Sequence, residues 1–155
     1  MAELNQTAEP GPAVASPGAF YSLIGGKLGF SKIRSGEDLA SLVEKRLPAM
    51  AVKALVRGGL SDAEVYQLIV PRRTLAHRIA KHQPLSKDES DKAVRVARIT
   101  AMAEQVFGEP GRAWRWLRKS KRRFDGRTPV EMLATEAGAR LVEEMIGQIE
   151  YGIFA

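Results

Sequence analysis

The sequence predicts an all-α fold, and three observations point to it. Apolar residues recur at steps of three and four through most of the chain, which is the spacing of one helix face. Helix-start signals are frequent, because Ser61, Ser86 and Thr128 are each followed three residues later by a glutamate. No stretch alternates apolar and polar residues over the length of a strand. The chain is therefore expected to form short capped helices around one longer helix.

The composition limits the class of protein. The 155 residues suffice for one domain or two small ones, and 45% of them are hydrophobic, as in ordinary globular proteins. The absence of cysteine excludes disulfides and Cys-ligated metal sites. No apolar run approaches the roughly 20 residues that span a bilayer, and a secretory signal is lacking, so we expect a cytoplasmic protein with no membrane partner. The net charge of +6 favours an anionic partner such as nucleic acid.

The N-terminal segment changes character at residue 20. Residues 1–19 are rich in Pro, Gly and Ala without periodicity, which predicts a flexible tail. Residues 20–30 form an apolar cluster interrupted by three glycines, and we expect it to pack on the core or on a second subunit. Gly25-Gly26-Lys27 has residues of a phosphate loop without its spacing, and we assign no nucleotide site there.

Four helices are expected between residues 35 and 82, each with its own boundary signals. The first begins at a Ser35 cap and has leucines on one face. Pro48 begins the second, and a Gly-Gly pair ends it because glycine readily adopts the left-handed conformation after a helix. The capping box at Ser61 begins the third, and Pro71 separates it from the fourth. The expected ranges are 35–47, 48–57, 61–69 and 72–82.

Four further helices are expected to complete the chain. A capping box at Ser86 begins a long helix with an apolar stripe, which Gly108 ends. Pro110 begins the next helix, and the capping box at Thr128 begins a short one with Pro129 in its first position. The final helix again carries apolar residues at three- and four-residue steps. The expected ranges are 87–107, 110–119, 129–134 and 135–151.

The fourth expected helix is strongly basic. Residues 71–87 hold five Lys or Arg, both histidines and no acidic residue. Two short capped helices joined by a tight turn, the second basic, predict a helix-turn-helix whose second helix enters the major groove. Leu75 and Ile79 are expected to anchor that helix to the core. A solvated basic helix in an ordinary bundle is the alternative that charge alone leaves open. The candidate DNA-binding residues are Arg72, Arg73, Thr74, His77, Arg78 and Lys81.

A second basic segment contains both tryptophans. Residues 112–127 carry eight Lys or Arg against one acid, with Trp114 and Trp116 between them. Aromatic rings among basic residues can stack on bases and grip phosphates, so an RNA-binding protein that uses Trp114 and residues 119–123 is one hypothesis. The alternative places the tryptophans in the core, and we favour it for Trp116. The loop at 119–123 is also a candidate for phosphate contacts that do not depend on sequence.

Ordered motifs add a resemblance to a known family. The C-terminal third resembles the toxin-binding domain of Xre/MbcA/ParS-type bacterial antitoxins. The motifs that carry this likeness are Gly126-Arg127-Thr128-Pro129, Thr135-Glu136-Ala137-Gly138 and Ile149-Glu150-Tyr151-Gly152. The upstream part is similar to the helix-turn-helix half of the same family, so the resemblance covers about residues 44–155. Its motifs are Gly59-Leu60-Ser61, Arg73-Thr74-Leu75, Pro84-Leu85-Ser86, Glu89-Ser90-Asp91, Phe107-Gly108 and Trp116-Leu117.

This resemblance implies the antitoxin of a type II toxin–antitoxin pair. The implied partner is a toxin of RES-domain or ParT type, which consumes NAD or transfers ADP-ribose, and the C-terminal domain would cover its active site. The helix-turn-helix would bind the operator of its own operon as a homodimer. The apolar chain end independently suggests an anchor for a partner's pocket, although it can also fold back on its own core. The candidate toxin-binding residues are Glu150, Tyr151, Gly152, Ile153 and Phe154.

We do not expect the protein to be an enzyme, and we expect no metal site and no cofactor. His77 and His82 lie five residues apart, so they do not share one helix face. Glu143 and Glu144 are adjacent and point in different directions, and no nucleophile motif is present. A stand-alone helix-turn-helix transcriptional regulator with a C-terminal effector or oligomerisation domain is the alternative function. The expected organisation is a tail at 1–19, a helix-turn-helix region at 20–86, a connecting helix at 87–108 and a toxin-binding domain at 109–155.

Overall fold

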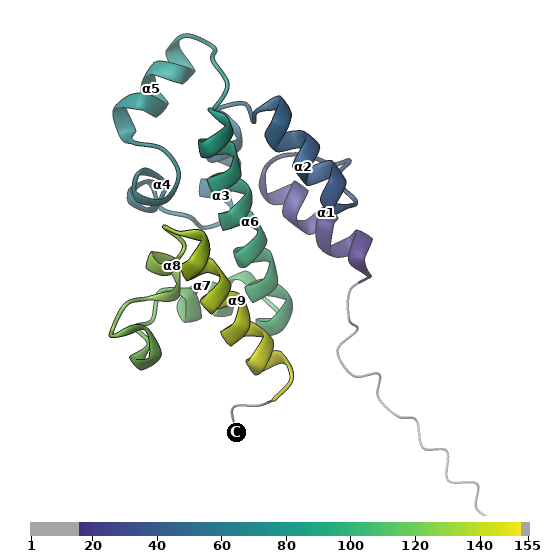
Figure 1. Cartoon of the computed structure of the whole chain (residues 1–155), viewed down its shortest axis with the longest axis vertical. Helices are drawn as coiled ribbons and strands as arrows, with labels where there is room; N and C mark the ends of the chain where they lie inside the picture. The colour runs from purple at the N-terminus through teal and green to yellow at the C-terminus, as the bar shows by residue number, and fades with distance from the viewer. Residues whose placement is uncertain (1–15, 153–155) are drawn as a thin grey trace, which may run out of the picture.

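The computed structural model describes residues 16–152, and this range is all-α, as predicted (Figure 1). Over that range, extended pairing is limited to one isolated bridge between Pro48 and Pro84. No helix among these residues is both long and apolar enough to cross a membrane. The elements in chain order are α1 (Pro17–Lys27), α2 (Gly36–Lys45), α3 (Ala51–Arg57), α4 (Asp62–Leu68), α5 (Arg72–Ala80), α6 (Lys87–Phe107), α7 (Pro110–Leu117), the 3-10 helix η1 (Arg122–Phe124), α8 (Pro129–Met132) and α9 (Glu136–Glu150).

The long helix α6 is the centre of the fold, and its bounds are those predicted. The helices α1, α2, α7 and α9 all pack against it (Figure 1). The apolar stripe predicted for this helix consists of Val96, Ile99, Ala103 and Val106. The first three are fully buried, and Val106 is partly buried. Fully burying one aliphatic side chain contributes about 1.5–3 kcal/mol, so this shared seam is a main source of stability. Gly108 ends the helix in the left-handed conformation, with φ of +81°.

Helix α1 corrects the predicted tail boundary. The tail was expected to reach residue 19, but Ser16 caps a helix that begins at Pro17, and its hydroxyl accepts a hydrogen bond from the Ala19 N–H at 3.3 Å. The remainder of that tail, residues 1–15, lies outside the described residues. The apolar cluster packs on the core, because Ile24 and Leu28 are fully buried. Of the two expected positions for this cluster, the core or a second subunit, the structure shows the core for Ile24 and Leu28.

Several helices are shorter than predicted, because long-range backbone pairing ends one and a local left-handed residue ends another. Pro48 does not begin α3, since the backbone there pairs with Pro84, and the Leu85 N–H donates to the Leu47 carbonyl at 2.8 Å. Helix α5 ends at Ala80 because His82 adopts a left-handed conformation, with φ of +52°. The pairing of Leu47 and Pro48 with Pro84 and Leu85 ties the end of α2 to the turn between α5 and α6. It therefore helps to hold the basic helix α5 in place.

Candidate functional site

Helix α5 carries the candidate DNA-binding residues at one end of the molecule (Figure 1). Leu75 is buried and Ile79 is half-buried, so both anchor the helix as predicted. The preceding helix α4 begins with a complete capping box, in which the Ser61 hydroxyl accepts from the Glu64 N–H at 3.1 Å and the Glu64 carboxylate accepts from the Ser61 N–H at 2.9 Å. Three residues separate α4 from α5, which gives the expected helix-turn-helix. The exposed candidates on or beside α5 are Arg72, Arg73, His77 and Lys81, whereas Thr74 is half-buried.

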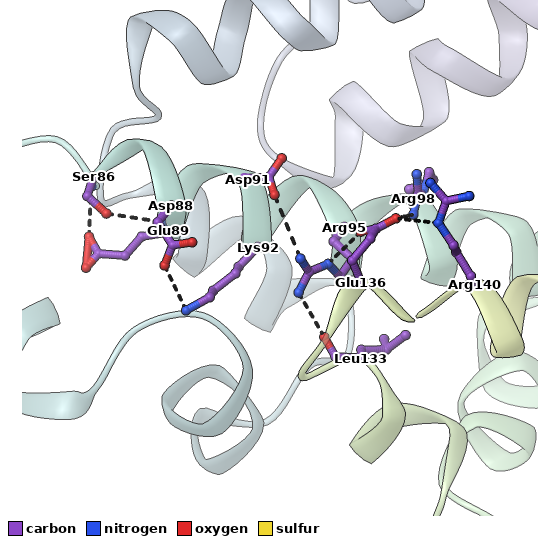
Figure 2. A network of polar contacts seen from close by, with 10 residues as sticks. All are labelled: Ser86, Asp88, Glu89, Asp91, Lys92, Arg95, Arg98, Leu133, Glu136 and Arg140. Carbon is purple, nitrogen blue, oxygen red and sulfur yellow. Dashed lines mark hydrogen bonds and ion pairs between the residues drawn. The ribbon is translucent and has the colours of Figure 1, made fainter. Parts of the chain in front are cut away.

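Arg78 differs from the other candidates, and its expected exposure is wrong. Its Nε lies 2.7 Å from Glu89 Oε1, and its Nη2 donates to Glu89 Oε2 at 3.1 Å. Glu89 also accepts from the Ser86 N–H at 2.8 Å in the capping box that begins α6 (Figure 2). Burial raises the pKa of Glu89, but the hydrogen bonds from Arg78 and Ser86 outweigh burial and hold this pKa below its usual range. Arg78 therefore ties α5 to α6.

Trp114 is a structural residue of the core. It is only 8% exposed, and its Nε1 donates to the Gly58 carbonyl at 2.9 Å. Gly59, at φ of +122°, lies so close that a Cβ at this position would overlap the Trp114 indole. The hypothesis that Trp114 stacks on single-stranded bases is therefore wrong, since its ring is already enclosed. The Gly-Gly pair at 58–59 predicted the end of a helix, and only the fold shows that Gly59 also makes room for the Trp114 ring.

Trp116 was the tryptophan favoured for the core, and it is only partly buried. Its ring packs against Phe107 with centroids 5.4 Å apart, and Lys121 Nζ lies 4.7 Å from its centroid. Burial lowers the pKa of Lys121, and the nearby charge of Lys119 lowers it further. Trp116 thus supports the base of the loop that follows α7, rather than the centre of the fold.

Arg118 joins the end of α7 to the start of the helix-turn-helix. Its Nη2 donates to the Gly59 carbonyl and to Glu64 Oε1, both at 2.7 Å. Its guanidinium carbon lies 4.4 Å from the Trp114 ring centroid. Burial raises the pKa of Glu64, but its hydrogen bonds with Arg118 and Ser61 prevail, and the pKa is lower than usual. The segment that follows α7 is therefore fixed relative to α4.

That segment, residues 119–127, is called the basic loop below. Phe124 anchors it, since this ring is only 2% exposed. The Lys121 N–H donates to the Arg127 carbonyl at 3.0 Å, and the Gly126 N–H donates to the Lys121 carbonyl at 3.0 Å. The loop is therefore a closed turn with a buried aromatic anchor. Its exposed cationic residues are Lys119, Arg122, Arg123 and Arg127.

The C-terminal hairpin is built from α8 and α9. Thr128 and Glu131 form the predicted capping box of α8, and Thr135 caps α9 by accepting from the Gly138 N–H at 3.0 Å. A Cβ at Gly138 would overlap the backbone carbonyl oxygen of Met132, so the glycine allows α9 to begin directly against α8. The close approach explains why glycine stands in the Thr135-Glu136-Ala137-Gly138 motif.

A charged network joins this hairpin to α6 (Figure 2). The carboxylate of Glu136 lies 3.0 Å from Arg95 Nε, 3.4 Å from Arg98 Nη2 and 3.7 Å from Arg140 Nε. Arg95 Nη1 also donates to the Leu133 carbonyl at 3.5 Å. Burial acts to raise the pKa of Glu136, but the two arginines of α6 bring it below its ordinary value. The network thus fixes the start of α9 on the central helix.

The candidate toxin-binding residues lie at the end of α9, and the described ones face solvent. Glu150 and Gly152 are exposed, and Tyr151 is 80% exposed. Ile153 and Phe154 lie outside the described residues. Leu141, on the same helix, is a second exposed apolar side chain, with 40% exposure. Among residues 16–152, no cluster of three or more His, Asp or Glu side chains could hold a metal ion.

Comparison with known proteins gives two family matches. The antitoxin Xre-like helix-turn-helix domain matches residues 38–98, and the antitoxin Xre/MbcA/ParS C-terminal toxin-binding domain matches residues 102–152. The first match contains α5, and the second contains the basic loop and α9. The matches together extend from α2 to the end of α9, and the boundary between them lies inside α6.

Several curated relatives are similar to this chain. Antitoxin Xre of Pseudomonas putida is 55% identical over 101 residues, which are 65% of this chain and 63% of the relative. Antitoxin Xre of Yersinia enterocolitica is 31% identical over 87 residues, 56% of this chain and 59% of the relative. The Prs ADP-ribosylating antitoxin of a Sphingobium species is 26% identical over 129 residues, 76% of this chain and 81% of the relative. The chain thus spans about three fifths of the first two relatives.

Proposed function

Because the chain belongs to the Xre/MbcA/ParS family of antitoxins, we propose that it is the antitoxin of a type II toxin–antitoxin pair. The observation that carries this proposal is the succession of the two matched domains on one chain, the first a helix-turn-helix and the second a toxin-binding domain. Each presents an exposed element, α5 in the first and the end of α9 in the second. The protein acts by binding and performs no catalysis.

The proposed partner is an RES-domain or ParT-type toxin that consumes NAD or transfers ADP-ribose. The name of the Sphingobium relative, Prs ADP-ribosylating antitoxin, refers to ADP-ribosylation, which supports ADP-ribose chemistry in this partner. Residues 109–155 form the toxin-binding domain, and its end covers the toxin's active site. Exposure supports this role for Glu150, Tyr151 and Gly152, because each is open to a partner. Ile153 and Phe154 extend the proposed contact.

The proposed second role is repression of its own operon. Residues 20–86 form the DNA-binding region, with α5 in the major groove, and residues 87–108 connect it to the toxin-binding domain. A homodimer would match two operator half-sites by two-fold symmetry. Arg78 positions α5 rather than reading bases, because Glu89 holds its guanidinium. The proposed DNA contacts are Arg72, Arg73, Thr74, His77 and Lys81.

A growth assay tests the antitoxin role. Expression of the adjacent gene alone should arrest growth, and co-expression with this protein should restore growth and yield a co-purifying complex. An early stop codon in this gene is the control, and it should remove the rescue. A harmless neighbour would contradict the proposal, and would favour the stand-alone transcriptional regulator with a C-terminal effector or oligomerisation domain.

The double variant Arg72→Ala/Arg73→Ala tests the DNA contacts. It should weaken binding to the DNA upstream of the gene at least about tenfold, because a bidentate arginine–guanine pair is worth about 1–3 kcal/mol. Fluorescence anisotropy with a labelled duplex measures this loss. Thermal stability and growth rescue should not change, since both side chains are exposed and neither forms an ion pair within residues 16–152. Wild-type affinity in this variant would refute the assignment of these two arginines.

A further inference from the structure

We propose that the basic loop is a second DNA-binding surface, which contacts backbone phosphates beside the half-site that α5 reads. The inference rests on the DNA-binding part of the proposed function and extends it to the C-terminal domain. It assigns to this domain a nucleic-acid contact in addition to its toxin contact. The partner is recognised by its phosphates, so the contact is independent of base sequence.

The charge of the basic loop is not neutralised within the described chain. The segment holds four exposed cations and one acidic residue, Asp125. None of the four cations forms an ion pair within residues 16–152. Arg123 donates only to the neutral Gln148 amide, at 2.8 Å, and Arg127 donates to a backbone carbonyl. By contrast, Arg112 and Arg115 on the neighbouring helix α7 lie 3.6 Å and 3.9 Å from Glu109. The uncompensated charge therefore concentrates in the loop.

The loop is also held in shape before any partner binds. The hydrogen bonds of Lys121 with Arg127 and Gly126 close residues 121–127 into a turn, and Phe124 within this turn is buried. A surface that is already ordered loses less conformational entropy on binding than a mobile basic tail. The fixed turn thus presents several cations together at a low entropic cost.

The position of the loop places it beside the expected path of the DNA backbone. In helix-turn-helix docking, the first helix crosses the backbone while the second enters the major groove. Here the first helix is α4, and Arg118, the residue before the loop, is bonded to Glu64 of α4 and to the Gly59 carbonyl. Figure 1 shows α5, α4 and the segment after α7 along the same edge of the view. The loop therefore begins next to the helix that faces phosphates.

An acidic face of the toxin is the competing partner, because the loop belongs to the toxin-binding domain. The side chains of the basic loop favour DNA over a protein surface as the partner. The centre of a protein interface is apolar and rich in aromatic residues, and charged residues as a group are depleted there. The single large apolar residue of the loop, Phe124, is buried, which leaves a purely polar and cationic surface. Such a surface matches phosphates, whose contacts come mainly from Arg and Lys.

The triple variant Lys119→Ala/Arg122→Ala/Arg123→Ala of the full chain tests the inference. Affinity for the DNA upstream of the gene and for an unrelated duplex of equal length should fall by a similar factor. The slope of log K against log salt should become shallower by about 2.7, since each phosphate contact contributes about 0.9. Two double variants of equal charge change provide the control. Lys32→Ala/Arg34→Ala, with both side chains exposed between α1 and α2, should leave the slope unchanged. Arg122→Ala/Arg123→Ala should make the slope shallower by about 1.8.

The remaining outcomes separate this inference from the proposed function. Equal slopes in the double variant of the basic loop and in its control would overturn the inference, and a weaker toxin complex in the triple variant alone would assign the loop to the toxin. If Arg72→Ala/Arg73→Ala weakens DNA binding while the triple variant does not, only the inference fails. If the wild-type protein binds neither duplex, DNA binding and the inference fail together. The single charge reversal Lys119→Glu should weaken binding to both duplexes, which checks the result with minimal change to the fold.

Discussion

Replacing Gly138 with alanine is expected to lower the free energy of unfolding by about 3 kcal/mol, as in a severely overpacked site. The new Cβ would overlap the Met132 carbonyl oxygen, and that atom belongs to the backbone of α8. The backbone cannot move easily, because Leu133 beside it is fully buried and accepts from Arg95. Relief of the overlap would therefore shift α8 away from α9 and disturb the toxin-binding hairpin.

Urea unfolding followed by circular dichroism measures this effect. Gly147 provides a matched control on the same helix, since a Cβ there would have no heavy atom within 4 Å. In that position alanine should stabilise the protein by about 0.5–1 kcal/mol, because it reduces the backbone freedom of the unfolded chain. Similar changes in the two variants would show that the close approach at Gly138 does not limit stability.

Deletion of residues 151–155 is expected to abolish toxin neutralisation while DNA binding is retained. Helix α9 ends at Glu150, and the side chain of Tyr151 is 80% exposed, so the deletion removes no buried side chain that the structure describes. The growth assay with the adjacent gene measures the loss directly, and DNA binding serves as the check that the truncated protein folds. If the truncated protein still rescues growth, the tail does not cover the toxin's active site. That result would not affect the assignment to the family.

Local signals in the sequence were sufficient to predict most of the fold. The capping boxes at Ser61, Ser86 and Thr128 begin the helices that they predict, because side chain and backbone complete each other's hydrogen bonds within four residues. Helix α1 was missed since Gly25 and Gly26 are typical of loops. The reason for Gly25 is a contact of the folded state, in which its Cβ would lie 2.6 Å from Ile33 Cβ. Local sequence does not reveal such an approach.

The candidate site was predictable where exposure follows from helix periodicity. Arg72 and Arg73 point away from the face that buries Leu75, as expected. Arg78 was misplaced because its partner Glu89 is in the next helix, although a glutamate in a capping box was a visible candidate. Which of the two tryptophans is more deeply buried depended on the turn at 58–59, where the Gly58 carbonyl accepts a hydrogen bond from Trp114 Nε1. Tertiary contacts, rather than periodicity, decided both cases.

Because α6 runs without a break through both domains, it limits how genes of this family can recombine their two halves. The two family matches end at residue 98 and begin at residue 102, so the junction lies within one unbroken helix. Each residue added to an α-helix turns everything beyond it by about 100°. A recombined gene, whether natural or engineered, would keep its new C-terminal half on the same face only if the splice preserved this helical phase. Lineages that shuffle toxin-binding halves should therefore conserve the number of residues across this junction, while the surrounding loops remain free to vary in length.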